Sequence, residues 1–215
     1  MSRRLAGAVV AVVGTGGLGR EIAAVLRERG ATVVTAGRGD GEVRLDIRDP
    51  EAGDALVAHA RTVHGRLDGV VVASGVVAFG TLEETDDVVV EELFLTNAIG
   101  PLWLAQRVLP ALRESRGFLA ALSGVVAASP MPGMVAYSAS KAALAAGLAA
   151  LRREVRRAGV SVCDVQPPHT ETGLATRPLA GTAPRMPEGL TPRTVAERVV
   201  VAIEGDEALV TADAF

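Results

Sequence analysis

The stretch that decides the fold is residues 9–22, VVAVVGTGGLGREI, where an apolar run meets a glycine-rich turn and then an amphipathic segment. The apolar run is typical of a strand, and the segment after the turn has the period of a helix. Between them, the pattern G-x-G-x-x-G lacks the side chains that would stop a backbone from turning tightly and approaching a pyrophosphate. A helix that starts there offers free N–H groups and the positive end of its dipole to the same phosphates. The residues predicted to hold the phosphates are Gly14, Thr15, Gly16, Gly17, Leu18 and Gly19.

The alternation of strand and helix continues along the chain. Short Val-, Leu- and Ala-rich runs predict strands at residues 8–13, 32–35, 43–45, 67–73, 118–122, 160–165 and 208–210. Helical periodicity predicts helices at residues 18–29, 50–63, 86–114, 134–157 and 194–204. Most of the strand runs are continuously apolar, as in parallel strands that are covered on both faces. We therefore predict an α/β fold with a doubly wound parallel sheet.

Composition excludes several classes of function. A net charge of −3 and 3% aromatic residues do not suit a nucleic-acid-binding protein, which needs a basic face and stacking side chains. The single cysteine, Cys163, excludes a disulfide scaffold and a cysteine-rich zinc site, and no metal site is predicted. Residues 117–140 carry no charge, but Pro130 and Pro132 argue against a spanning helix there. We expect no membrane association and a cytoplasmic location.

The ends of the second and third predicted strands bear on which nucleotide is bound. The second strand is followed by Arg38 and not by an acidic residue. An acidic side chain at this position would accept hydrogen bonds from both ribose hydroxyls of NAD(H) and would repel the 2′-phosphate of NADP(H). Because a guanidinium can fork onto a phosphate, we predict a preference for NADP(H), with NAD(H) as the alternative. A solvated loop arginine beside Asp40 is the other interpretation of Arg38. After the third strand, Asp46 is placed to meet the adenine amino group, with Ile47 beside it.

Lysine, tyrosine and asparagine each occur only once. The chain uses arginine for every other basic position, yet it has one lysine, Lys141, four residues after its one tyrosine, Tyr137. Side chains at i and i+4 share a helix face. A nearby ammonium stabilises a phenolate and lowers the pKa of the phenol, which a general acid or base needs near pH 7. The only asparagine is Asn97.

Residues 137–141, YSASK, resemble the Y-x-A-S-K motif of the classical short-chain dehydrogenases/reductases. The resemblance extends through the glycine loop, Asp46, residues 96–100, residues 132–133 and residues 167–172, which is nearly the whole chain. It implies one Rossmann-like domain over residues 1–215, with about seven parallel strands, helices on both faces and a substrate loop at about 173–190. It also implies a homodimer or homotetramer through the long helices.

The resemblance further implies the chemistry and the roles of named residues. Hydride would pass between NADP(H) and a carbonyl or alcohol carbon. Independently of the resemblance, Leu174, Leu179, Met186 and Met134 indicate a small, apolar substrate, and Arg177 and Arg185 leave room for an acidic group on it. Tyr137 would donate the proton, Lys141 would bind the nicotinamide ribose and lower the pKa of Tyr137, and Asn97 would hold a relay water. The remaining implied cofactor contacts are Ala73, Ser74, Gly75, Pro167, Thr170 and Thr172.

Two departures from the family pattern leave a second interpretation open. The fourth strand ends in residues 72–75, VASG, where the family has N-N-A-G. The catalytic serine of the family falls on Gly124, and the neighbouring Ser123 is a candidate catalytic residue only if the strand end bulges, since adjacent strand residues point to opposite faces. On this basis we expect Gly124→Ser to restore a lost hydrogen-bond donor. The alternative function is a catalytically weak or inactive NADP(H)-binding protein with a regulatory or structural role.

Overall fold

The apolar runs of the sequence form strands, most of them buried, in the computed structural model, which describes residues 3–215. All of the strands are parallel and form one sheet in the order β3-β2-β1-β4-β5-β6-β7. The prediction of a doubly wound, Rossmann-like sheet with seven strands is confirmed. The strands are β1 (Val9–Val13), β2 (Thr32–Gly37), β3 (Val43–Arg44), β4 (Gly69–Val72), β5 (Phe118–Leu122), β6 (Ser161–Val165) and β7 (Leu209–Val210).

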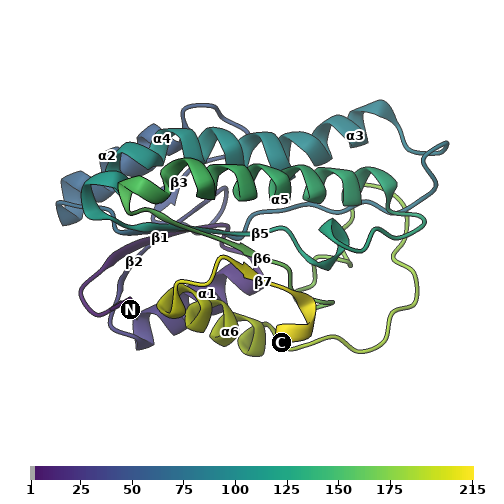
Figure 1. The fold of residues 1–215 in the computed structure, drawn as a ribbon. Helices are drawn as coiled ribbons and strands as arrows, with labels where there is room; N and C mark the ends of the chain where they lie inside the picture. Colours follow the sequence, from purple (N-terminus) through teal and green to yellow (C-terminus); the bar gives the residue numbers. More distant parts are fainter. Residues whose placement is uncertain (1–2) are drawn as a thin grey trace.

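Helices cover both faces of the sheet (Figure 1). On one face lie α1 (Gly17–Glu28) and α6 (Pro192–Gly205), and on the other lie α2 (Ala52–His64), α3 (Asp87–Phe94), α4 (Gly100–Ser115) and α5 (Val135–Val155). The side chains of β1 alternate between the two layers: Val10 and Val12 join the core cluster under α1 and α6, whereas Ala11 and Val13 join the one under α2, α4 and α5. Short helical turns η2 (Val125–Ala127), η3 (Arg156–Ala158) and η4 (Ala212–Ala214) complete the elements.

The sheet reverses its strand order between β1 and β4, and this reversal positions the site. The chain winds outward from β1 to β3 on one side and from β4 to β7 on the other. At such a switch point, the loops after the carboxyl ends of the strands diverge and leave a crevice for a ligand. The glycine-rich turn follows β1 at this point, beside residues 73–75 that follow β4.

The helix predicted at residues 86–114 is interrupted. It consists of α3, a π-helical turn η1 (Leu95–Ile99) and α4, and Gly100 N–H donates to Leu95 O across the wider turn. Pro101 has no N–H to donate to the carbonyl of Asn97, so a regular α-helical pattern cannot continue through this point. Asn97 lies in the middle of the widened turn.

The same interrupted helix is apolar enough to cross a membrane. By length and composition alone, Asp87–Ser115 could span a bilayer, and 44% of its most apolar window is buried inside the structure. Leu104, Val108 and Leu112 of α4 belong to the core cluster over the sheet. Residues 117–140, the uncharged tract singled out from the sequence, are divided among β5, η2 and the start of α5.

The connection between β2 and β3 is unusually short. Parallel strands are normally joined by a crossover of a dozen or more residues, commonly with a helix. Here residues 38–42 make the connection, and Ala36 pairs with Val43. No helix therefore covers the outer face of β3, and Arg44 is exposed there. The short connection also keeps Arg38 at the carboxyl end of β2.

The irregular tract at residues 173–190 folds back over the site and is held at two places. At its base, Thr170 and Leu190 form a parallel bridge. At its tip, Leu179 N–H donates to Val77 O at 2.8 Å and Phe79 N–H donates to Ala180 O at 2.9 Å. We refer to residues 173–190 as the covering loop.

Candidate active site

The glycine-rich turn is built by close backbone contacts that exclude side chains. Gly14 has a φ of 112°, and a Cβ there would lie 2.6 Å from Ser74 N. A Cβ on Gly19 would lie 1.8 Å from Gly14 O, so only glycine lets α1 start directly behind β1. Gly14 N–H donates to Ala36 O at 2.8 Å, and this bond ties the turn to β2.

The N-terminus of α1 presents its backbone donors without a side-chain partner. Gly16 is the N-cap residue, no capping side chain accepts from the backbone N–H groups of the first turn, and this turn carries no acidic residue. No atom lies within 4 Å of a Cβ built on the exposed Gly16. Leu18 is half-buried against the core cluster under α1 and α6. Free N–H groups, a positive dipole end and open space are the features that fit a pyrophosphate.

At the carboxyl ends of β2 and β3, one arginine is free and another is occupied. Arg38 is exposed and forms no ion pair with any residue in the described range 3–215. Asp46 accepts from the Arg48 guanidinium at 2.6–3.1 Å, and this contact lowers the pKa of Asp46, with a smaller contribution from Arg38. Thr15 lies beside Gly37: its Oγ1 is 3.3 Å from where a Cβ of Gly37 would be.

An adenine amino group would have to compete with Arg48 for the carboxylate of Asp46. A contact between the Ile47 side chain and the cofactor is not supported. Both carboxylate oxygens of Asp46 already accept bonds from Arg48. Ile47 is 5% exposed and points into the core cluster, so its side chain is unavailable to a ligand.

Residues 73–75 connect the phosphate end of the crevice with α5. Ser74 Oγ donates to Val13 O at 3.2 Å and fixes the end of β4 to the end of β1. Ala73 packs against the core cluster of the α1 face. A Cβ on Gly75 would lie 3.3 Å from both Asn97 Oδ1 and Lys141 Nζ, so this glycine admits the two polar side chains to the crevice.

Asn97 is fully buried and its amide makes three bonds. Nδ2 donates to Val76 O at 2.9 Å and to Ser140 Oγ at 3.0 Å, and Oδ1 accepts from Val76 N at 2.9 Å. Ser140 Oγ in turn donates to Tyr137 O. The Asn97 side chain thus joins the segment after β4 to α5. Through Ser140 it is linked to the backbone of Tyr137.

Tyr137 and Lys141 lie on one face of α5, over the end of β5. Lys141 is 6% exposed and its Nζ donates to Leu122 O at 2.8 Å. Burial lowers the pKa of Lys141 to about 8, and Asp164 acts in the opposite direction. Tyr137 and Leu174 of the covering loop pack against the same buried cluster, which is formed by Val77, Phe79, Val126 and Met134.

The expectation of a lowered pKa for the tyrosine is not met. Burial raises the pKa of Tyr137 to about 12. The cause is desolvation, which penalises the charged phenolate. In this geometry Tyr137 is a protonated phenol at neutral pH.

The prediction of Ser123 as a catalytic residue is wrong, because its hydroxyl does not reach the crevice. It is fully buried, and its hydroxyl donates to Asp164 Oδ1 at 2.5 Å. Gly124 leaves open space, with no atom within 4 Å of a Cβ built on it. Its φ of 83° and ψ of 160° nevertheless belong to a region that is essentially restricted to glycine. A serine at this position would be strained, contrary to the sequence-based expectation.

The segment after β6 closes the site from the opposite side. Pro167 O accepts from Val125 N at 3.0 Å, and Thr170 Oγ1 donates to Pro168 O at 2.9 Å. Thr172 lies on the glycine-rich turn: its carbonyl oxygen is 2.8 Å from where a Cβ of Gly17 would be. Pro167, Thr170 and Thr172 are therefore at the same edge of the sheet as the glycine loop.

Sequence reasoning missed the buried polar residues of β6. Asp164 and Gln166 are each 7% exposed, and Gln166 Nε2 donates to Asp164 Oδ2 at 2.8 Å. A signal was present, because Asp164 is a carboxylate inside an otherwise apolar strand run. Only the pairing of β6 with β5, where Asp164 lies opposite Ala121, brings it near Ser123.

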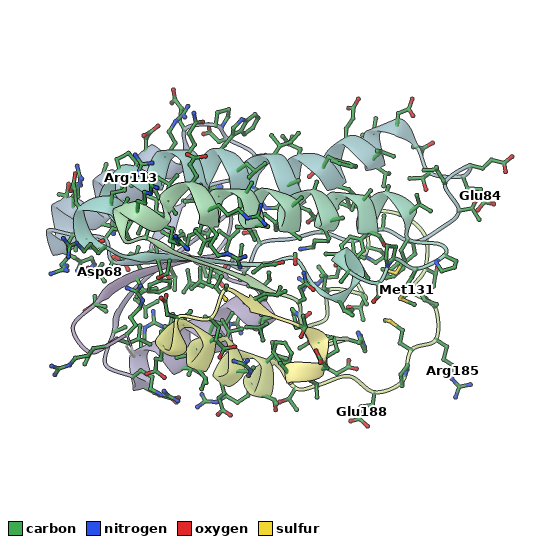
Figure 2. The ribbon with its side chains drawn as sticks, in the orientation of Figure 1. Asp68, Glu84, Arg113, Met131, Arg185 and Glu188 are labelled. Atoms are coloured by element: carbon green, nitrogen blue, oxygen red, sulfur yellow. The ribbon has the colours of Figure 1, made fainter. Side chains whose placement is uncertain are left out.

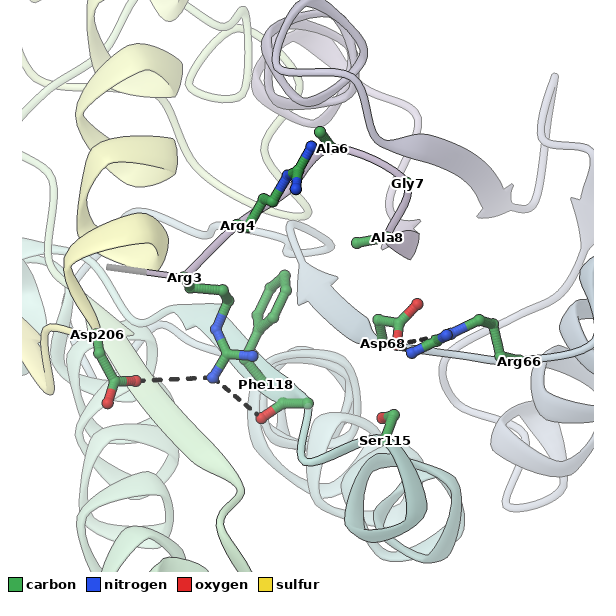
Figure 3. Close-up of a pocket in the computed structure, with 11 residues that line it drawn as sticks. Arg3, Arg4, Ala6, Gly7, Ala8, Arg66, Asp68, Ser115, Phe118 and Asp206 are labelled. Atoms are coloured by element: carbon green, nitrogen blue, oxygen red, sulfur yellow. Dashed lines mark hydrogen bonds and ion pairs between the residues drawn. The ribbon is translucent and has the colours of Figure 1, made fainter. Parts of the chain in front are cut away.

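The opposite edge of the sheet has a hollow of its own, of about 510 Å³ (Figure 3). Its carboxylates are paired with arginines: Asp206 with Arg3 at 3.8 Å and Asp68 with Arg66 at 2.5 Å. The Arg3 guanidinium also lies over the Phe118 ring. Figure 2 shows the separation of the two ends, with Asp68 at one and Arg185 of the covering loop at the other. The hollow is thus remote from the Tyr137 site.

Comparisons with known proteins agree on one family. The family model described as short chain dehydrogenase matches residues 8–180. Dehydrogenase/reductase SDR family member 7B of Mus musculus is 31% identical over 194 residues, covering 80% of this chain and 60% of the mouse protein. An uncharacterized oxidoreductase of Staphylococcus aureus (strain USA300) is 28% identical over 212 residues, covering 91% of this chain and 90% of that protein.

Solved structures agree with this. A short-chain dehydrogenase from Streptomyces avermitilis superposes with a TM-score of 0.84 and 26% identity, covering 97% of this chain and 90% of the other. A short chain dehydrogenase from Burkholderia cenocepacia J2315, solved in complex with NADP, gives a TM-score of 0.84 and 26% identity, covering 99% and 91%.

Proposed function

The chain belongs to the short-chain dehydrogenase/reductase family of oxidoreductases, and from that premise we propose that it uses NADP(H) to interconvert a carbonyl and an alcohol on a small, apolar substrate. The observation that carries this proposal is the Tyr137–Lys141 face of α5. Lys141 is bonded to the end of β5 and lies next to Gly75, and Tyr137 shares a buried cluster with Leu174 of the covering loop. The crevice after β1 and β4 supports the cofactor assignment, because its turn fits a pyrophosphate.

The proposed mechanism assigns the proton to Tyr137. A bound nicotinamide would supply or accept the hydride. Tyr137 holds its proton at neutral pH and is the acid of the proposed carbonyl reduction, although its pKa of about 12 lies above the range in which a general acid is most efficient. Lys141, fixed by Leu122 O, stabilises the phenolate that remains after proton transfer and keeps two further N–H donors for a ribose. The covering loop excludes water from the reacting atoms through Leu174 and Ala180.

A second function is favoured by the end of β5. Gly124 has no hydroxyl, and that of Ser123 is bound to Asp164, so this segment offers no side-chain donor to a substrate oxygen. Loss of one such donor typically lowers a rate by about 10²–10³. A catalytically weak or inactive NADP(H)-binding protein with a regulatory or structural role is the alternative.

The test is Tyr137-dependent turnover. The parent and Tyr137→Phe are assayed with NADPH and a panel of ketones and aldehydes, and with NADP and alcohols, while cofactor binding is followed by nucleotide fluorescence. The oxidoreductase proposal expects slow but measurable turnover in the parent, none in Tyr137→Phe, and unchanged NADPH binding. Tight NADPH binding without turnover in the parent would favour the binding protein.

The cofactor preference has its own test. We propose that the unpaired Arg38 guanidinium binds the 2′-phosphate of NADP(H), a charge-assisted contact of about 1.5–3 kcal/mol, or roughly 10- to 150-fold in affinity. Arg38→Ala should weaken NADPH binding by that factor and leave NADH binding nearly unchanged. Arg113→Ala, which removes the same charge at the far end of the molecule, is the matched control (Figure 2). Equal affinities for the two nucleotides in the parent would refute the preference.

We also propose a cytoplasmic homodimer or homotetramer. Support comes from the outer faces of the long helices, where Ile99 and Leu102 are exposed and Gly147 lets Leu102 approach α5. Small residues on such faces permit close helix packing. Sedimentation velocity checks the assembly, and a purely monomeric species at micromolar concentration would contradict it.

A further inference from the structure

A buried carboxylate lies next to the Lys141 site and is held by neutral donors only. Asp164 Oδ1 accepts from Ser123 Oγ at 2.5 Å, and Oδ2 accepts from Gln166 Nε2 at 2.8 Å. All three side chains belong to residues that are 7% exposed or less. Both carboxylate oxygens of Asp164 are therefore hydrogen-bonded. Within residues 3–215, Asp164 forms no ion pair, so no cation in direct contact neutralises its charge.

The carboxylate faces the same layer as the lysine. Along β6, Val162 belongs to the core cluster under α5, whereas Cys163 and Val165 belong to the opposite cluster. Asp164 therefore points toward α5, since successive strand residues alternate. Lys141 reaches the sheet from α5 and donates to Leu122 O, and the next residue, Ser123, holds Asp164. Two adjacent residues at the end of β5 thus fix two buried groups of opposite charge.

We propose that Asp164, fixed by Ser123 and Gln166, is a positioning residue that supplies the counter-charge for Lys141. The proposal deepens the proposed function and rests on it for its consequence, that Lys141 acts as a cation beside Tyr137. A buried ammonium without a nearby negative charge tends to lose its proton. A carboxylate in direct contact would occupy donors of the ammonium, whereas one fixed by neutral groups stabilises the charge and leaves those donors free.

Few other charges act on this ammonium. On its own helix the nearest titratable group is Tyr137. The packed turns η1 and η2 contain no titratable residue. The charged groups of the other elements packed against α5 are exposed or paired with other residues. Asp87 and Glu91 of α3, Arg113 of α4, and Arg156 and Arg157 of η3 are exposed; Glu92 is bonded to Arg48, Arg107 to Asp54 and Glu114 to Arg61. Asp164 is consequently the one acidic group on an element packed against α5 that lies close enough to raise the pKa of Lys141.

Because Lys141 is the only lysine of the chain, its protonation can be observed without assignment ambiguity. Protein labelled with ¹³C-lysine gives a single Cε signal whose chemical shift is followed from pH 5 to 11. In Asp164→Asn, Ser123 can still donate to the amide oxygen and Gln166 can flip its own amide to accept. We expect the pKa of Lys141 to fall by about one unit or more in this variant.

Two controls separate the charge from the packing. Asp68→Asn removes a comparably buried carboxylate at the opposite edge of the sheet and should leave the Lys141 signal unchanged. Ser123→Ala keeps the charge of Asp164 and should shift the pKa of Lys141 less than Asp164→Asn does. An unchanged pKa in folded Asp164→Asn overturns the proposal. If that variant does not fold, Asp164→Ser replaces it, and a pKa below 7 in the parent also overturns the proposal.

A kinetic measurement links the proposal to catalysis. In the pH profile of kcat/KM, one limb reports the pKa of Lys141. In Asp164→Asn this pKa should shift by the same amount as the pKa measured by NMR. A purely structural role of Asp164 would not produce this shift. If the parent has no Tyr137-dependent turnover, the proposed function fails. The lysine titration would still decide whether Asp164 is the counter-charge, so the two failures are distinguishable.

Discussion

At the scale of single residues, the end of β5 shows how backbone conformation decides which side chain is possible. Gly124 is surrounded by open space, yet its φ of 83° and ψ of 160° are costly for any residue with a Cβ. Its N–H, like that of Ser123, donates to Val165 O, so the segment is held in this conformation by β6. Space alone therefore does not make the position suitable for serine.

The first prediction follows from this strain. Gly124→Ser should lower the free energy of unfolding by about 1–3 kcal/mol, because the new side chain forces the residue out of, or strains it within, its present conformation. Urea denaturation of the parent and variant measures the loss. Gly39→Ser is the matched control, since Gly39 is exposed, has no atom within 4 Å of a built Cβ and has an ordinary φ. Equal midpoints for Gly124→Ser and the parent would show that the backbone adapts at no cost.

At the scale of elements, the covering loop depends on one close approach at its tip. Gly181 has a φ of 71°, and a Cβ there would lie 1.9 Å from Phe79 O. The neighbouring backbone bonds between residues 179–180 and 77–79 hold the loop over Tyr137. A side chain at residue 181 cannot be accommodated without separating these two segments.

We therefore predict that Gly181→Ala loosens the covering loop. Trypsin should cleave the variant faster than the parent after Arg185, which is exposed in the loop and is followed by Met186. Mass spectrometry of early digestion products identifies the sites. Thr182→Ala changes an exposed neighbour and should digest like the parent. If Gly181→Ala digests at the parent rate, the tip contact does not hold the loop.

Strands, helices and turns that depend on the pattern of neighbouring residues in the sequence were predictable. The apolar runs and the G-x-G-x-x-G turn predicted the sheet, and the i, i+4 spacing placed Tyr137 and Lys141 together. The π turn was not predicted, because it is a compromise between Pro101 and the packing of α4 on the sheet. Asp164 was missed because its partners come from other segments, which only the strand register reveals.

At the scale of the whole molecule, the buried lysine links stability to pH. Burial lowers the pKa of Lys141 to about 8 in the folded protein, against 10.5 for a lysine in the unfolded chain. Between these values the unfolded chain binds more protons than the folded one, so this group makes stability rise with pH. Tyr137 and Cys163, whose pKa values burial raises to about 12, act in the opposite direction above pH 9–10.

The prediction is best expressed as a difference between two proteins. In Lys141→Met the contribution of the lysine disappears, while those of Tyr137 and Cys163 remain. The free energy of unfolding of the parent minus that of the variant should increase by about 3 kcal/mol from below pH 8 to above pH 10.5. Urea titrations at several pH values measure it. A difference that does not change with pH would mean that Lys141 is not buried as described.

The burial of Lys141 also means that chemical modification of its amine can be used to measure how often the folded protein opens. An acylating reagent that attacks neutral amines has one ε-amine to find in this chain, and that amine is 6% exposed beneath α5. Modification at Lys141 then requires the reagent to enter the crevice beside Gly75, so its rate measures the population of molecules in which the crevice is open when closing is fast. Nucleotides, substrates and sequence variants can be ranked by how strongly they protect that single amine, with no need for turnover.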